Sequence, residues 1–220
     1  MLDQLQPLTI LFFIILYLTI LVCLYILQKF IQIQPEYLRK FIHAVCGLTC
    51  LTYPLLFNNI LSVIIIMGAA IGFFLFVRLP YLKSMFNPVL NLRAFSLGEI
   101  YFPISIILLF GLARENYLEF VIPVLVLSLA DAAASIVGIK YHFIEYKIFN
   151  NKKSLSGSLA FFIVCLFCMA IPIYFSNTSI PFIYLLLFAI ILTLLEGISS
   201  RGIDNLILPV VTYLMLHYFS

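Results

Sequence analysis

Long apolar runs separated by short polar breaks dominate the hydropathy pattern of this chain. The apolar runs cover residues 8–28, 41–57, 60–77, 98–113, 118–139, 158–175, 180–196 and 204–219. A helix needs about 20 apolar residues to cross the roughly 30 Å hydrocarbon core of a bilayer, and several runs are shorter than this. The pattern predicts an all-α, polytopic transmembrane helical bundle of about eight short spans, in which the shortest runs are candidates for half-spans.

The composition supports a membrane location. Of the 220 residues, 65% are hydrophobic and only 10% are charged, and the mean hydropathy is +1.19. A soluble domain averages about 25% charged residues, so most of this surface must face lipid. Because no internal repeat is visible, we expect one integral membrane domain over residues 1–220, with the span 8–28 as a candidate peripheral helix beside a functional bundle at 36–219.

Basic residues fall almost entirely in alternate connections between the predicted spans. Eleven of the twelve occupy the first, third, fifth and seventh connections: Lys29, Arg39, Lys40, Arg78, Lys83, Arg93, Lys140, Lys147, Lys152, Lys153 and Arg201. The twelfth, Arg114, lies on the other side. Since cytoplasmic connections carry an excess of Lys and Arg, this bias predicts a multi-pass protein with both termini on the non-cytoplasmic side. The net charge of +3 gives no indication of nucleic acid as a partner.

An acidic residue, Asp131, stands inside the fifth apolar run, in the segment VLVLSLADAAASIVGIK. An ionisable residue within a span costs about 2.5–3.5 kcal/mol on insertion scales and is a functional candidate for that reason. It lies about 13 Å below the predicted end of the span at Lys140. Ser128, Asp131, Ser135 and Gly138 recur on one helical face, where small neighbours allow a helix or ligand to approach. The alternatives are a helix-packing surface with a buried acid and the ion site of a small transporter.

A basic segment rich in serine and glycine, NKKSLSGS at 151–158, precedes the sixth run. Ser154 or Ser156 is suited to cap the following helix. The amino-terminal N–H groups of that helix, with Lys152 and Lys153 beside them, make a ready anion site. The alternative is a positively charged loop followed by a capped helix. Together with Asp131, the segment favours phosphate binding.

Two carboxylates and a carboxamide, Glu196, Asp204 and Asn205, flank a connection that contains Gly197 and Gly202. Hard oxygen ligands of this kind suit Mg²⁺, which takes one or two carboxylates and completes its shell with water and substrate phosphates. The alternative is a polar loop between spans. Apolar residues adjoin the acids on both sides, so we expect the acids at the membrane boundary.

The segment EYLRKFIH at 36–43 opens the second run, and its Arg39 and His43 share a helical face. His43 is a candidate to face phosphate or to lie in the membrane interface, and Glu99, near Arg93, is a weaker candidate. All these segments fall on the cytoplasmic side of the predicted topology. Basic residues for phosphates and acids for a metal, in apolar surroundings, imply that a water-soluble phosphate donor meets a lipid at that face.

These segments resemble the polyprenol kinase family, which groups dolichol kinase, phytol kinase and a CTP-dependent diacylglycerol kinase. The chain is more distantly similar to phosphatidate cytidylyltransferase. The similar pieces lie between about 36 and 209: RKFIH at 39–43, GEIYFP at 98–103, LADAAASIVG at 129–138, KSLSGSLAFF at 153–162, and Glu196 with Asp204-Asn205. Two positions depart from the family pattern, His142 where a glycine is frequent and Ser156 where an acid is common.

The resemblance implies transfer of the terminal phosphate of CTP to the hydroxyl of a polyprenol, phytol or diacylglycerol, with Mg²⁺ as cofactor. The implied catalytic residues are Asp131, Lys153, Glu196 and Asp204, and the implied metal ligands are Asp131, Glu196 and Asp204. Residues expected to bind the nucleotide or the lipid head are Arg39, Lys40, His43, Ala134, Gly138, Lys152, Ser154, Gly157, Ser158 and Asn205. The alternative reaction is cytidylyl transfer to a lipid phosphate, but the His-Gly-Gly run of that family's fuller signature is not found here.

Overall fold

The computed structural model describes residues 6–90, 97–113, 116–141, 143–148, 151–176, 178 and 180–219. Arg93, Arg114 and His142, which entered the topology and the family comparison, lie outside the described residues. The elements, in chain order, are α1 (Gln6–Ile31), α2 (Pro35–Cys50), α3 (Tyr53–Leu56), α4 (Ile60–Val77), α5 (Pro80–Leu90), α6 (Gly98–Leu112), α7 (Tyr117–Leu125), the π-helix η1 (Val126–Ala130), α8 (Asp131–Lys140), β1 (Glu145–Ile148), β2 (Asn151–Ser154), α9 (Leu155–Tyr174), α10 (Phe182–Ile198) and α11 (Asp204–Phe219).

The predicted apolar runs form helices, with one correction. Seven runs match α1, α4, α6, the continuous α7–η1–α8 helix, α9, α10 and α11 to within three residues at each end. The run 41–57 instead divides into α2 and the short α3, because Pro35 begins α2 early and Pro54 opens a new first turn. Proline lacks an N–H and is tolerated where a helix starts, since that donor has no intrahelical partner there.

Helix α5 and the strands β1 and β2 were not predicted from the hydropathy pattern. Helix α5 mixes polar and apolar residues and therefore gives no apolar run. The strands β1 and β2 form a short antiparallel hairpin, with Glu145 opposite Ser154, which the sequence did not predict, in a fold that is all-α in class. The rest of the described chain has no strand, and the molecule is otherwise a helical bundle.

Four helical segments are long and apolar enough to cross a membrane: 6–31, 60–77, 117–140 and 155–174. Helices α6 and α10 are apolar but shorter. Large side chains such as Phe12, Ile65 and Leu159 point outward and are more than half exposed. Exposed apolar surface on this scale is rare in soluble proteins and is expected where a surface contacts lipid.

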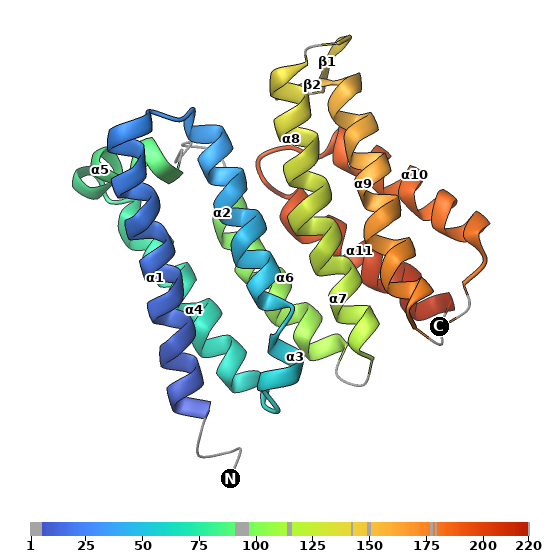
Figure 1. Ribbon diagram of the computed structural model, residues 1–220, viewed down its shortest axis with the longest axis horizontal. Helices are drawn as coiled ribbons and strands as arrows, with labels where there is room; N and C mark the ends of the chain where they lie inside the picture. The colour runs from blue at the N-terminus through green and yellow to red at the C-terminus, as the bar shows by residue number, and fades with distance from the viewer. Residues whose placement is uncertain are drawn as a thin grey trace.

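The continuous helix formed by α7, η1 and α8 is the centre of the bundle. Its most apolar stretch is 67% buried, against 11% for α1, and Figure 1 shows it between α2 and α9. One core packs α7–α8 against α9, α10 and α11, and another packs α7 against α2, α3, α4 and α6. The central helix thus receives side chains from both halves of the molecule.

A π-helical turn interrupts the central helix directly before Asp131. Ser128 lies against Gly47 of α2, and Asp131 also faces α2, whereas Gly138 lies against Gly157 of α9. Asp131 and Gly138 are seven residues apart in the regular helix α8, which keeps them on one helical face, and they meet different helices because they lie at different heights along it. The π turn ends before Asp131 and holds an extra residue, so it changes the register of Ser128 alone. Turns of this kind occur frequently at functional sites.

Helices α8 and α9 approach each other through small residues. A methyl group at Gly157 would lie 2.8 Å from the carbonyl oxygen of Ala134 and 3.3 Å from Cα of Gly138. Real side chains do not tolerate the first of these distances without movement of the backbone. The small residues assigned to nucleotide binding from the sequence therefore have a packing role in the structure.

Gly157→Ala should destabilise the protein by about 1–3 kcal/mol, because the added methyl group meets backbone that cannot move aside cheaply. Gly68→Ala on α4 is the matched control, since nothing lies within 4 Å of its added methyl group. The control should be neutral or stabilising by up to about 1 kcal/mol, in line with helix propensity. The unfolding midpoints of the detergent-solubilised proteins measure both, and equal midpoints would contradict the close packing.

Candidate functional site: an ionic cluster beside an apolar cavity

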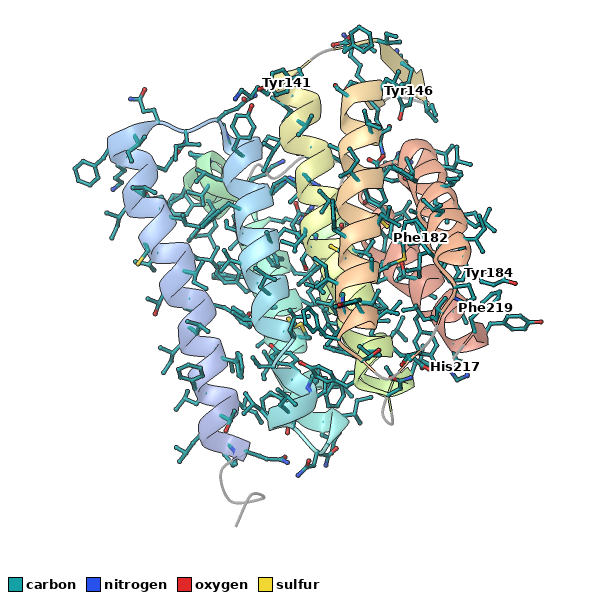
Figure 2. The ribbon with its side chains drawn as sticks, turned by 45° about the vertical axis from the view of Figure 1, so that its right-hand side comes forward. Tyr141, Tyr146, Phe182, Tyr184, His217 and Phe219 are labelled. Atoms are coloured by element: carbon teal, nitrogen blue, oxygen red, sulfur yellow. The ribbon has the colours of Figure 1, made fainter. Side chains whose placement is uncertain are left out.

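The charged segments that the sequence singled out gather at one end of the bundle. Figure 1 shows the α1–α2 connection, α5 and the β1–β2 hairpin at the same end, whereas α3 and the start of α7 lie at the other. In Figure 2, Tyr141 and Tyr146 mark the hairpin end and His217 marks the opposite end. Connections that are far apart in sequence therefore share one region.

Asp131 is paired with Lys40 of α2. The Nζ atom of Lys40 lies 2.5 Å from Oδ2 of Asp131, and the two side chains are only 6% and 3% exposed. Asp131 thus has its cation from α2 and not from the basic segment at 151–158. A charge-assisted hydrogen bond of this length offsets the desolvation free energy of burying both charges. Either charge buried alone would destabilise the fold by several kcal/mol.

A second ion pair joins the hairpin to α10. Nζ of Lys153 lies 2.7 Å from Oε1 of Glu196 and also donates to the backbone carbonyl of Glu196. The hairpin is held in place by the hydroxyl of Tyr146, which lies 2.7 Å from Oγ of Ser158. Lys152 points away from this contact, with an exposed side chain 4.0 Å from Glu145. Of the two adjacent lysines, only Lys153 therefore reaches the interior.

Ser154 caps α9, as predicted. Its Oγ accepts a hydrogen bond from the backbone N–H of Gly157 at 3.2 Å and lies 3.0 Å from the hydroxyl of Ser156. Ser156 in turn donates to the backbone carbonyl of Tyr141. The start of α9 is thus fixed beside Lys153 by a chain of short polar contacts.

The loop between α10 and α11 turns sharply and delivers Asp204 to the same region. Arg201 and Gly202 both adopt positive φ, at 57° and 84°. Asp204 then begins α11, with Oδ1 accepting from the N–H of Asn205 at 3.0 Å. The Asn205 side chain donates to the carbonyl of Gly98 at 2.8 Å, which ties α11 to the start of α6.

Asp204 interacts electrostatically with Asp131, Lys40 and Lys153, and Glu196 interacts with Asp131 and Asp204. We call these five residues, Lys40, Asp131, Lys153, Glu196 and Asp204, the ionic cluster. Its two lysines and three acids carry a formal charge of −1. A surplus acid suits a phosphate ligand that arrives with a divalent cation better than a bare anion.

The predicted set of three acids around one metal ion is not present in the described part of the chain. No group of three or more His, Cys, Asp or Glu side chains lies there at ligand distances. Two of the three acids are already paired with lysines, Asp131 with Lys40 and Glu196 with Lys153, and point toward them. Asp204 makes no ion pair with a described residue, so it is the carboxylate best placed to accept a cation. One carboxylate, with phosphates and water, is an ordinary Mg²⁺ shell.

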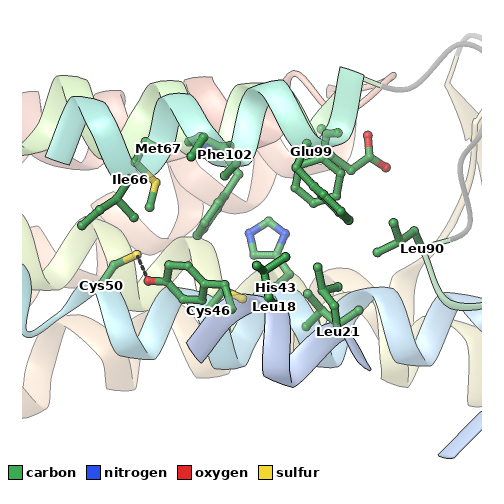
Figure 3. A pocket seen from close by; sticks show the side chains of 18 of the residues that line it. Leu18, Leu21, His43, Cys46, Cys50, Ile66, Met67, Leu90, Glu99 and Phe102 are labelled. Atoms are coloured by element: carbon green, nitrogen blue, oxygen red, sulfur yellow. Dashed lines mark hydrogen bonds between the residues drawn. The ribbon is translucent and has the colours of Figure 1, made fainter. Parts of the chain in front are cut away.

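An apolar cavity of about 140 Å³ lies among α1, α2, α4 and α6. Arg39 and His43 both line it, as their shared helical face predicted, and Glu99 and Asn205 line it as well. Figure 3 shows His43 and Phe102 close together in its middle, with Cys50, Ile66 and Met67 toward one end. Arg39 also interacts with Asp131 and Glu99, so the cavity adjoins the ionic cluster.

Glu99 was a weak candidate in the sequence, and the structure makes it a strong one. Its side chain is 7% exposed and pairs with Arg78 at 3.0 Å. The local sequence could not predict that Glu99 is buried, because Glu99 lies at the start of an apolar run, where a charged residue is usually exposed. Arg39, by comparison, pairs with Glu36 of its own helix at 2.5 Å.

Comparisons with protein-family models, with characterised proteins and with solved structures give no match to this chain. The resemblance to polyprenol kinases therefore remains a prediction.

Breaking the Lys40–Asp131 pair from either side should destabilise the protein by about 3–5 kcal/mol, because each single change leaves a buried charge without its partner. Lys40→Met and Asp131→Leu test this separately. The double variant should be more stable than the sum of the two losses predicts. Unfolding midpoints of all four proteins give the coupling, and simple additivity would show that the two side chains do not depend on each other.

Proposed function

We propose that this protein is a CTP-dependent lipid-alcohol kinase, which transfers the terminal phosphate of CTP to the hydroxyl of a polyprenol, phytol or diacylglycerol. The observation that carries the proposal is the ionic cluster: two lysines and three acids, from four distant segments, interact among apolar helices. Phosphoryl transfer depends mainly on positioning and on charge stabilisation. Cations and acids brought together at the edge of a lipid-facing bundle suit that chemistry.

The proposal includes a topology. Eight helical segments cross or enter the membrane, both termini lie on the non-cytoplasmic side, and the ionic cluster opens to the cytoplasm. The four long apolar helices support the membrane location. The common position of the lysine-bearing connections at one end of the bundle supports the orientation, since such connections favour the cytoplasm. CTP and membrane lipids would then meet at the same end of the protein.

In the proposed reaction the hydroxyl oxygen of the lipid forms a bond to the γ-phosphorus of CTP. The bond from that phosphorus to the β–γ bridging oxygen breaks, and CDP leaves with the electron pair. The hydroxyl proton passes to a carboxylate of the ionic cluster, Asp131 or Asp204. Lys153, beside the capped start of α9, and Lys40 neutralise the phosphates. The products are a lipid phosphate and CDP.

Asp204 and Asn205 are the residues we assign to Mg²⁺, because neither of them is bonded to Lys40 or Lys153. The cation supplies charge neutralisation to the phosphates. Asp131 and Glu196 then serve to hold Lys40 and Lys153 in place, which replaces the three-acid metal site expected from the sequence. Removal of divalent cations with a chelator should abolish phosphoryl transfer.

The first test supplies purified protein with Mg²⁺ and CTP labelled at either the α- or the γ-phosphate, together with phytol, longer prenols, diacylglycerol and phosphatidate. Label should pass from γ-CTP to an alcohol. Transfer from α-CTP to phosphatidate would identify a cytidylyltransferase instead. If neither label reaches lipid in folded protein, the kinase proposal fails, and an ion-transport role for Asp131 becomes the next hypothesis to test.

Neutralising the acids of the ionic cluster should lower the rate of phosphoryl transfer by about 10²–10³. Asp131→Asn, Glu196→Gln and Asp204→Asn make the change with little loss of volume. Glu119→Gln is the matched control, because Glu119 is also a buried acid but pairs with His217 at the far end of the bundle. The control should keep its rate. Full activity in a folded Asp131→Asn protein would refute the central assignment.

A further inference from the structure

The apolar cavity carries buried polar atoms that nothing in the described chain satisfies. Oε2 of Glu99 pairs with Arg78, but its Oε1 has no hydrogen-bond partner among the described residues. Nε2 of His43 is also buried and has no hydrogen-bond partner among the described residues. The centre of the His43 ring lies 4.5 Å from the centre of the Phe102 ring. A buried polar atom left without a bond costs about 1–3 kcal/mol, so two of them along one cavity indicate a ligand with a polar group.

A hydroxyl group matches both atoms. An ionised carboxylate only accepts hydrogen bonds, whereas the imidazole nitrogen accepts or donates according to its tautomer. A hydroxyl donates one hydrogen bond and accepts others, so a hydroxyl that enters the cavity can satisfy either Glu99 or His43 before its proton passes to the ionic cluster. A carboxylate or phosphate ligand would instead be repelled by Glu99.

The remainder of the cavity fits a hydrocarbon chain with access from the membrane. Residues such as Ile42, Met67 and Phe102 make its wall apolar. Leu18 of α1 and Ala69 of α4 line the cavity and are also exposed on the outer surface. A chain that enters from the lipid-facing surface between α1 and α4 would pass the small side chains of Ala69 and Ala70.

The size of the cavity limits what enters. An apolar cavity of about 150 Å³ stays dry and binds benzene, a molecule of six carbons. The cavity of about 140 Å³ here accordingly holds the first few carbons of one chain. Diacylglycerol would bring two ester groups next to its hydroxyl, and each carbonyl oxygen placed against this wall without a donor costs about 1–3 kcal/mol.

We infer that the cavity among α1, α2, α4 and α6 binds the hydroxyl end of a single-chain lipid alcohol, with the hydroxyl at Glu99 or His43 and the chain leaving between α1 and α4. The inference rests on the proposed function and narrows its acceptor to prenol-like alcohols. Arg39 and Asn205 line the cavity, and Arg39 also interacts electrostatically with Asp131 of the ionic cluster. Asn205 follows Asp204, another member of the cluster, so the hydroxyl site adjoins the ionic cluster.

The test fills the cavity and measures binding separately from catalysis. Ala70→Phe places a ring where the chain should lie, and Ala70→Leu makes a smaller change should the larger one impair folding. Ile65→Phe is the matched control, because Ile65 lies on the same helix but faces outward, 53% exposed. Phytol, without nucleotide, should raise the unfolding midpoint of the unchanged protein and of the control but not that of the Ala70 variants.

Catalysis gives the second readout. With γ-labelled CTP, the Ala70 variants should raise KM for phytol by about tenfold or more while KM for CTP stays within about twofold, since a pocket contact of this size is worth 10–200-fold. Phytol should be a better acceptor than dioleoylglycerol. Equal use of the two lipids, or Ala70 variants that behave like Ile65→Phe, would overturn the inference.

The two proposals fail in different ways. If phytol stabilises the protein in an Ala70-dependent manner but no γ-label reaches any lipid, the cavity assignment stands and the kinase proposal falls. If label reaches dioleoylglycerol and phytol neither binds nor reacts, the kinase proposal stands and the single-chain acceptor is refuted.

Discussion

The buried ion pair between Lys40 and Asp131 sets the arrangement of the helices around the site. Either charge alone would cost several kcal/mol inside an apolar bundle. With 2.5 Å between Nζ and Oδ2, each offsets the cost of the other, and α2 is fixed against α8. The approach also requires Gly47, because a side chain there would collide with Ser128 in the π turn that precedes Asp131.

The Lys153–Glu196 pair completes the polar region from the other side of the central helix. It needs the hairpin, which follows α8 and returns the chain to α9 with Lys153 pointing inward. The hairpin fits there only because α8 and α9 are packed closely through Gly138 and Gly157. The hairpin, the Lys153–Glu196 pair and the close contact of α8 with α9 thus lie next to one another in the structure.

Helix α2 separates two different environments. Lys40 faces the central helix and the ionic cluster, whereas Arg39 and His43 face the apolar cavity. Adjacent residues on a helix point about 100° apart, so a single turn serves both sides. The turn of α2 that carries Arg39, Lys40 and His43 therefore contributes side chains both to the ionic cluster and to the apolar cavity.

The sequence by itself determined the positions of most helices, the membrane character and a serine cap at 154 or 156, because hydropathy, charge depletion and capping depend on neighbouring residues. It also singled out most members of the site, since an acid inside an apolar run is visible locally. The tertiary structure alone decided that Lys40 neutralises Asp131 and that Glu99 and His43 share a cavity. Those contacts join residues as far as 91 positions apart, and their energies depend on distance and burial, which no local pattern contains.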